Sequence, residues 1–202
     1  MSLITMLADD NVTITEIGAW LDSCLPQARK DAVFGLDRRH QRKLYERASD
    51  GPAITSAHFV PDGRDPLTEV IHHGRNTLPL PASHRVFQKR FCRSPEDATR
   101  IFGYNEARSR SLIGPGYFVA YETASRSEWK PRGGVVVDYF DVPDGPVVPD
   151  WPTVVPNSRG LQVLVYHKTR DFMRRVSQHV SIGAAYKKER GLGQFFVLVR
   201  DD

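Results

Sequence analysis

Gly133-Gly-Val-Val-Val-Asp-Tyr-Phe140 carries the clearest structural signal in this chain, because β-branched and aromatic residues favour a strand. The stretch Tyr117-Phe-Val-Ala-Tyr-Glu122 has the same character and is its predicted antiparallel neighbour. The polar residues 123–131 connect the two stretches. We therefore expect a mainly antiparallel sheet built around this pair of strands.

The end of the chain predicts another strand. Gly193-Gln-Phe-Phe-Val-Leu-Val-Arg200 contains an uninterrupted apolar run, which is typical of a central strand covered on both faces. Farther upstream, residues 57–60 and 67–73 flank a Val-Pro-Asp-Gly turn, and we expect these two segments to form a hairpin.

Helices are expected near the start of the chain and before its last strand. Thr13 and Glu16 have the spacing of a capping box, in which the two side chains bond backbone amides at a helix start. Two short helices, separated at Pro26, are predicted in this region. Apolar residues in 161–176 recur at helical spacing and predict a long helix, with a strand over 161–166 as the alternative.

These elements do not alternate as βαβ units should, so they predict an α+β fold. We expect a mainly antiparallel sheet of about five strands, N-terminal helices and one long helix before the last strand. At 202 residues, the chain fits a single globular domain over 1–202. Its helical part is predicted at roughly 13–50 and its sheet-containing part at roughly 55–202.

The composition is that of a soluble protein, with 40% hydrophobic and 26% charged residues. No stretch has the roughly 20 apolar residues that span a bilayer, and the first residues lack the basic region of a secretory signal. We therefore expect a cytoplasmic protein with no membrane partner. Cys24 and Cys92 lie far apart in the sequence and are expected to be buried, reduced thiols.

The basic stretch from Arg85 to Arg110 is the candidate ligand site. Phe87 and Phe91 have helical spacing within it, and arginine presents a planar fork that matches phosphate and carboxylate oxygens. The best interpretation is a non-catalytic domain that binds a small anionic metabolite. Charge would come from Arg90, Arg93 and Arg108, and walls would come from Tyr117 and Tyr139. A solvated helix face is the alternative.

Two other functions stay open. In a small enzyme, His179 would act as a general acid or base beside Ser181, since histidine titrates near neutral pH. In a nucleic-acid binder, phosphate contacts would come from basic helices that contain Arg38, Arg39, Arg42 and Lys43. Neither a nucleophile elbow nor a familiar nucleic-acid-binding motif accompanies these residues.

Metal and cofactor motifs are missing from the sequence. The neighbours His72 and His73 would point to opposite faces of a strand, and the aspartates at 138, 141, 144 and 150 lack calcium-loop spacing. We expect no metal and no cofactor. A homodimer is the expected assembly if the protein is not a monomer.

Overall fold

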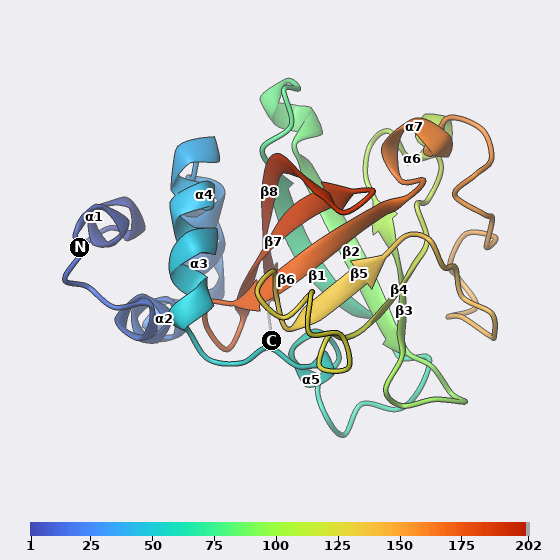
Figure 1. Ribbon diagram of the computed structural model, residues 1–202, viewed down its shortest axis with the longest axis horizontal. Coiled ribbons are helices and arrows are strands. Elements are labelled where there is room, and N and C mark those ends of the chain that lie inside the picture. Colours follow the sequence, from blue (N-terminus) through green and yellow to red (C-terminus); the bar gives the residue numbers. More distant parts are fainter. Residues whose placement is uncertain (201–202) are drawn as a thin grey trace.

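Eight antiparallel strands close into a barrel in the computed structural model, which describes residues 1–200 (Figure 1). Each strand pairs with the next along the chain, and β1 pairs with β8 to close the barrel. The strands are β1 (Val70–Asn76), β2 (Val86–Arg93), β3 (Ile101–Glu106), β4 (Phe118–Glu122), β5 (Val135–Asp138), β6 (Thr169–Arg175), β7 (Val180–Lys187) and β8 (Arg190–Arg200).

The predicted α+β fold with a five-stranded sheet is therefore wrong. The expected pairing of the stretches at 117–122 and 133–140 is confirmed, because Tyr121 of β4 lies opposite Val136 of β5. This hairpin is one step of a closed meander, in which closure leaves no unpaired strand edge.

Side chains fill the barrel interior. Large rings lie opposite glycines at the inward positions of neighbouring strands. The ring of Phe196 fills the space beside Gly183, and the ring of Phe118 fills the space beside Gly103. A Cβ atom on Gly183 would lie 2.3 Å from Phe196, and one on Gly103 would lie 2.5 Å from Phe118. The interior is thus a packed core.

Short helices form a layer against one side of the barrel (Figure 1). They are α1 (Leu3–Ala8), α2 (Ile14–Ser23), α3 (Pro26–Phe34) and α4 (Arg38–Arg47), followed by the 3₁₀ turn η1 (Ala48–Asp50). The capping box of Thr13 and Glu16 is confirmed at the start of α2. Helices α3 and α4 pack against β8, and α4 also packs against β7.

Strand β8 shows why an apolar run belongs between two layers. Phe196 and Leu198 belong to the core of the barrel interior, whereas Val197 and Val199 pack with the helices on the outside. The expectation of a central strand covered on both faces is confirmed.

Three predicted elements have a different secondary structure. Residues 85–110, expected to be helix-like, contain β2 and β3, and the expected long helix at 161–176 contains only α7 (Gln162–Val165) followed by strand β6. The segment expected as the first strand of a hairpin forms α5 (Ser56–Phe59) instead. Phe87 and Phe91 explain the first error, because a spacing of four places two residues on one face of a strand as well as of a helix.

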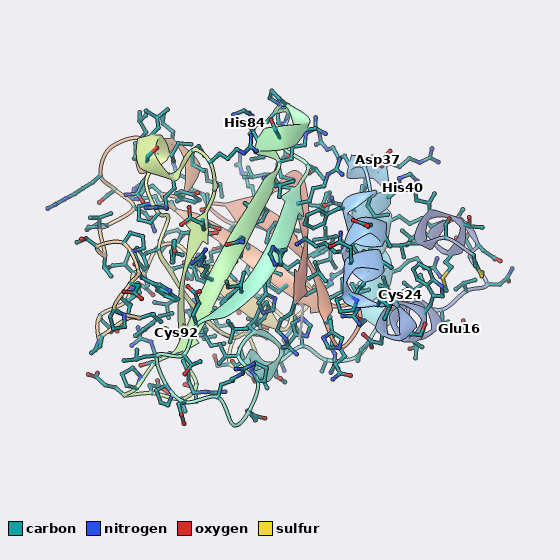
Figure 2. All side chains as sticks on the ribbon, turned by 180° about the vertical axis from the view of Figure 1, so that it is seen from behind. Glu16, Cys24, Asp37, His40, His84 and Cys92 are labelled. Atoms are coloured by element: carbon teal, nitrogen blue, oxygen red, sulfur yellow. The ribbon has the colours of Figure 1, made fainter. Side chains whose placement is uncertain are left out.

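The remaining short elements are η2 (Ala82–His84) and α6 (Arg110–Ile113). Among residues 1–200, no helix has the length and apolar character needed to cross a membrane. Cys92 is buried on β2, whereas Cys24 is only half-buried at the end of α2, and Figure 2 shows the two cysteines well apart.

Candidate functional site

A pocket of about 390 Å³ lies between helix α4 and strands β6, β7 and β8. Cationic and aromatic side chains dominate its wall. The lining residues are Arg38, Arg42, Tyr45, Glu46, Arg174, Ala184, Ala185, Tyr186, Gly191, Gly193 and Phe195. We call this site the arginine pocket.

The start of α4 places two of the three arginines. Asp37 caps the helix by accepting a hydrogen bond from the backbone N–H of His40 at 2.9 Å, and this bond lowers the pKa of the Asp37 carboxyl. Figure 2 shows Asp37 and His40 at one end of α4. Because residues four apart share a face of a helix, Arg38 and Arg42 both reach the pocket.

The third arginine comes from the barrel. Arg174 on β6 donates hydrogen bonds to the backbone carbonyls of Tyr45 and Pro131. Its guanidinium carbon lies 4.1 Å from the centroid of the Tyr45 ring, which is within the range of a cation–π interaction. Neutral groups therefore hold this positive charge in place.

Aromatic rings form the apolar part of the wall. Tyr45 is buried, and its hydroxyl donates a hydrogen bond to the backbone carbonyl of Arg132. Burial raises the pKa of the Tyr45 hydroxyl, so this side chain stays neutral at physiological pH. The Phe195 ring lies 5.5 Å from the Tyr45 ring, centroid to centroid.

The charge of the pocket is not balanced. Arg42 forms an ion pair with Glu46 at 2.8 Å on the exposed side of α4. Within the described residues 1–200, neither Arg38 nor Arg174 forms an ion pair. Two positive charges therefore face the pocket without a carboxylate partner, which favours an anionic ligand.

A glycine lets the Arg38 guanidinium approach the barrel closely. Gly193 has a φ of 62°, a left-handed conformation that other residues rarely adopt. A Cβ atom at this position would lie 3.2 Å from Nη2 of Arg38. The glycine thus serves both the turn of the backbone and the position of the arginine.

The residues predicted to bind a ligand lie in several places. Arg90 bonds Gln88 and pairs with Glu69 at 3.2 Å, and its guanidinium carbon lies 6.0 Å from the Tyr104 ring. The ring of Tyr117 also packs against Tyr104, with centroids 5.5 Å apart, and the buried Tyr117 donates its hydroxyl proton to the backbone carbonyl of Pro152. Arg90 and Tyr117 thus both lie beside Tyr104, and each already has hydrogen-bond partners.

Arg93 and Arg108 lie elsewhere. Arg93 lines a second cavity of about 570 Å³, where its Nη2 donates to the carbonyl of Val60 at 2.9 Å and lies 3.6 Å from a carboxylate oxygen of Asp62. Arg108 is exposed in the segment that follows β3. The structure does not bring these arginines together with Arg90 and the two tyrosines in one of the two cavities described.

Tyr139 lies inside the barrel in a buried polar cluster. Nζ of Lys89 lies 3.2 Å from a carboxylate oxygen of Asp171, and it donates to Oδ1 of Asn105 at 3.0 Å and to the Tyr139 hydroxyl. Burial lowers the pKa of Lys89 and raises the pKa of Asp171, while their mutual attraction opposes both shifts. We call Lys89, Asn105, Tyr139 and Asp171 the interior cluster.

His179 and Ser181 flank the start of β7. His179 is half-buried between β6 and β7, and its backbone N–H donates to the Ser177 hydroxyl at 3.2 Å. Ser181 is buried on β7, opposite Arg175 of β6 and Leu198 of β8. Catalysis by this pair stays a prediction. Among residues 1–200, histidine, cysteine and acidic side chains form no group of three or more that could hold a metal ion.

Comparison of this chain with protein-family models, with curated proteins and with solved structures finds no match.

Arg38 and Arg42 were expected as phosphate contacts on basic helices, and the pocket that they line was not predicted. Their spacing of four was a usable signal, because it placed both on one face. The contributions of Arg174 and Phe195 could not be found in this way, since they lie on β6 and β8, on either side of β7, and reach the site only in the folded sheet.

Proposed function

We propose that this protein is a non-catalytic binding domain whose arginine pocket holds a small anionic metabolite with a planar, apolar part. The observation that carries the proposal is the pair of uncompensated arginines, Arg38 and Arg174, beside the neutral rings of Tyr45 and Phe195. A guanidinium forms bidentate hydrogen bonds with phosphate or carboxylate oxygens. The half-buried rings of Phe195 and Tyr186 offer a surface for the apolar part of the same molecule.

The residues that line the arginine pocket support a non-catalytic binding site. The lining residues drawn from the described part of the chain include no histidine, cysteine, serine or lysine. Arginine stays charged and the buried Tyr45 stays neutral across the physiological range. The pocket can therefore orient and neutralise an anion.

Four probes test the proposal through the melting temperature. They are phenyl phosphate, benzoate, inorganic phosphate and phenol, so that the phosphate, the carboxylate and the ring are varied separately. A ligand at ten times its Kd stabilises the folded state by about 1.4 kcal/mol. In a domain of this size, that raises Tm by about 3–5 °C. We expect phenyl phosphate or benzoate to produce this shift at 10 mM, and phenol to produce none.

Two matched variants locate the binding site. Arg38→Gln removes a charge-assisted hydrogen bond, worth about 1.5–3 kcal/mol, and should raise the Kd at least tenfold in calorimetric titration. Arg39→Gln makes the same change at the next residue of α4, which is exposed and does not line the pocket. Its Kd should match that of the unmodified protein. Equal weakening by both variants, or a shift with phenol alone, would show that the pocket does not recognise the anion.

A further inference from the structure

Two short helices cover one end of the barrel and are fixed to each other. The backbone N–H of Gly116, just after α6, donates to Oε1 of Gln162 on α7 at 2.9 Å. Gly114 packs so closely on Gln162 that a Cβ atom there would lie 2.5 Å from its side chain. Figure 1 shows α6 and α7 side by side, across the molecule from α1 to α4. We call these two helices the cap.

The cap presents its apolar side chains to solvent. In α7, the single polar residue Gln162 is buried, whereas the three aliphatic residues after it are exposed. Leu164 is 71% exposed, and Leu112 on α6 is 73% exposed. The exposed aliphatic residues of the cap and its margin are Leu112, Leu161, Val163, Leu164 and Val165. The exposed aliphatic side chains do not contribute to the core, so this surface points to a contact outside the chain.

Positive charges border these aliphatic residues. Residues 157–168 contain Arg159 and Lys168, both exposed, and no aspartate or glutamate. Nζ of Lys187 reaches the backbone carbonyl of Leu164 at 3.4 Å. On the α6 side, Arg108 is exposed, and Glu106 is already paired with Arg110 at 2.9 Å. The border of the cap is therefore cationic, and its partner should be anionic.

The combination of aliphatic tip and cationic border selects one kind of partner. A second copy of the chain would bring the same positive border against itself, which is repulsive. Protein interfaces concentrate their binding energy in aromatic residues and arginine, whereas the exposed apolar residues here are all leucine and valine. Leucine side chains that enter the headgroup region, with lysine and arginine beside them, are the pattern of a surface that lies on a membrane.

We propose that the cap docks on the surface of a bilayer that contains anionic lipids. Leu112 and Leu164 enter the interface between headgroups and acyl chains, and Arg159 and Lys168 contact the lipid phosphates. This surface is separate from the arginine pocket. A membrane contact there differs from the sequence-based expectation that no membrane is a partner.

Vesicle flotation tests this proposal with the full chain. We expect the protein to float with vesicles of 70% phosphatidylcholine and 30% phosphatidylserine, at least fivefold more than with pure phosphatidylcholine. Sodium chloride at 0.5 M should lower the bound fraction by screening the charges. Each of Arg159→Gln and Lys168→Gln should lower the partition coefficient about fivefold.

Matched leucine variants separate insertion from general charge effects. The double variant Leu112→Asp/Leu164→Asp should lower the partition coefficient at least tenfold, with an unchanged melting temperature because both side chains are exposed. Leu25→Asp makes the same change at a residue that is 79% exposed at the start of α3, and it should bind like the unmodified protein. Arg38→Gln should also keep vesicle binding, which makes this test independent of the arginine pocket.

Three results would overturn the proposal: no flotation with anionic vesicles, equal loss of binding in Leu25→Asp, or equal binding to both lipid compositions. A dimer in sedimentation analysis that the double variant abolishes, without any vesicle binding, would assign the cap to contact between copies.

Discussion

Lys89→Met removes the cation of the interior cluster and leaves the buried carboxylate of Asp171 without its ion-pair partner. The side chains of Lys89 and Asp171 are 2% and 9% exposed, so water cannot replace the lost contact. Breaking a buried pair by removing one partner costs about 3–5 kcal/mol of folding stability. The Tyr139 hydroxyl, which donates to Asp171 at 3.3 Å, stays in place and limits the loss.

The folded variant can protonate Asp171, which sets a pH-dependent upper limit on the stability that Lys89→Met loses. The ordinary pKa of this carboxyl is 3.8, and each pH unit above that value adds about 1.4 kcal/mol to the cost of keeping it neutral. Protonation therefore limits the usual loss of about 3–5 kcal/mol to about 4 kcal/mol at pH 7, and to about 2 kcal/mol at pH 5. Because burial raises the folded-state pKa, the variant binds more protons folded than unfolded, and its stability falls as pH rises between these values.

Urea denaturation at pH 5 and pH 7 measures both costs. The double variant Lys89→Met/Asp171→Leu replaces the pair by apolar side chains and should recover most of the loss at pH 7, to within about 2 kcal/mol of the unmodified protein. A loss below about 1 kcal/mol for Lys89→Met, unchanged between the two pH values, would refute the buried ion pair.

Four smaller changes test other parts of the structure. Thr13→Ala should lower the unfolding free energy by about 1 kcal/mol through loss of the α2 cap, and Thr13→Ser should not. Gly193→Ala and Gly63→Ala should each lower the unfolding free energy by about 1–2 kcal/mol, because both glycines have positive φ. Only Gly193→Ala should also weaken anion binding in calorimetry, since only there does the new Cβ meet Arg38. Burial, with His72 and Arg200 nearby, lowers the pKa of His58 well below 6.5. The unfolding free energy should therefore fall as pH drops from 7 to 5, and it should fall less in the His58→Gln variant. Burial raises the pKa of the Cys92 thiol to about 12, so a thiol reagent should modify Cys24 in the folded protein and both cysteines only in urea.

The strands that the sequence predicted are those whose apolar residues are consecutive or strongly β-branched. In β5 and β8 this pattern has no helical interpretation, since a helix with the same residues would be apolar on every side. The strands that were missed are amphipathic. In β2 the inward positions are Phe87, Lys89 and Phe91, and a buried lysine between two rings hides the period of two.

Closure of the barrel could not be predicted from the sequence. It depends on the pairing of β1 with β8, which joins His72 to Arg200 across most of the chain. No local pattern encodes such a contact. The arginine pocket was missed for a different reason, because the segment that contains Arg174 was expected to be a helix and forms strand β6. The N-terminal capping box was found because its geometry is set by four consecutive residues.

The most direct measurement for the arginine pocket is a nuclear magnetic resonance titration that follows the arginine Nε–H signals as phenyl phosphate is added. The proposed function predicts saturable shifts of the Arg38 and Arg174 signals, with the Arg39 signal unchanged. Shifts confined to Arg90, Arg93 or Arg108, or no saturable shift at any arginine, would contradict it.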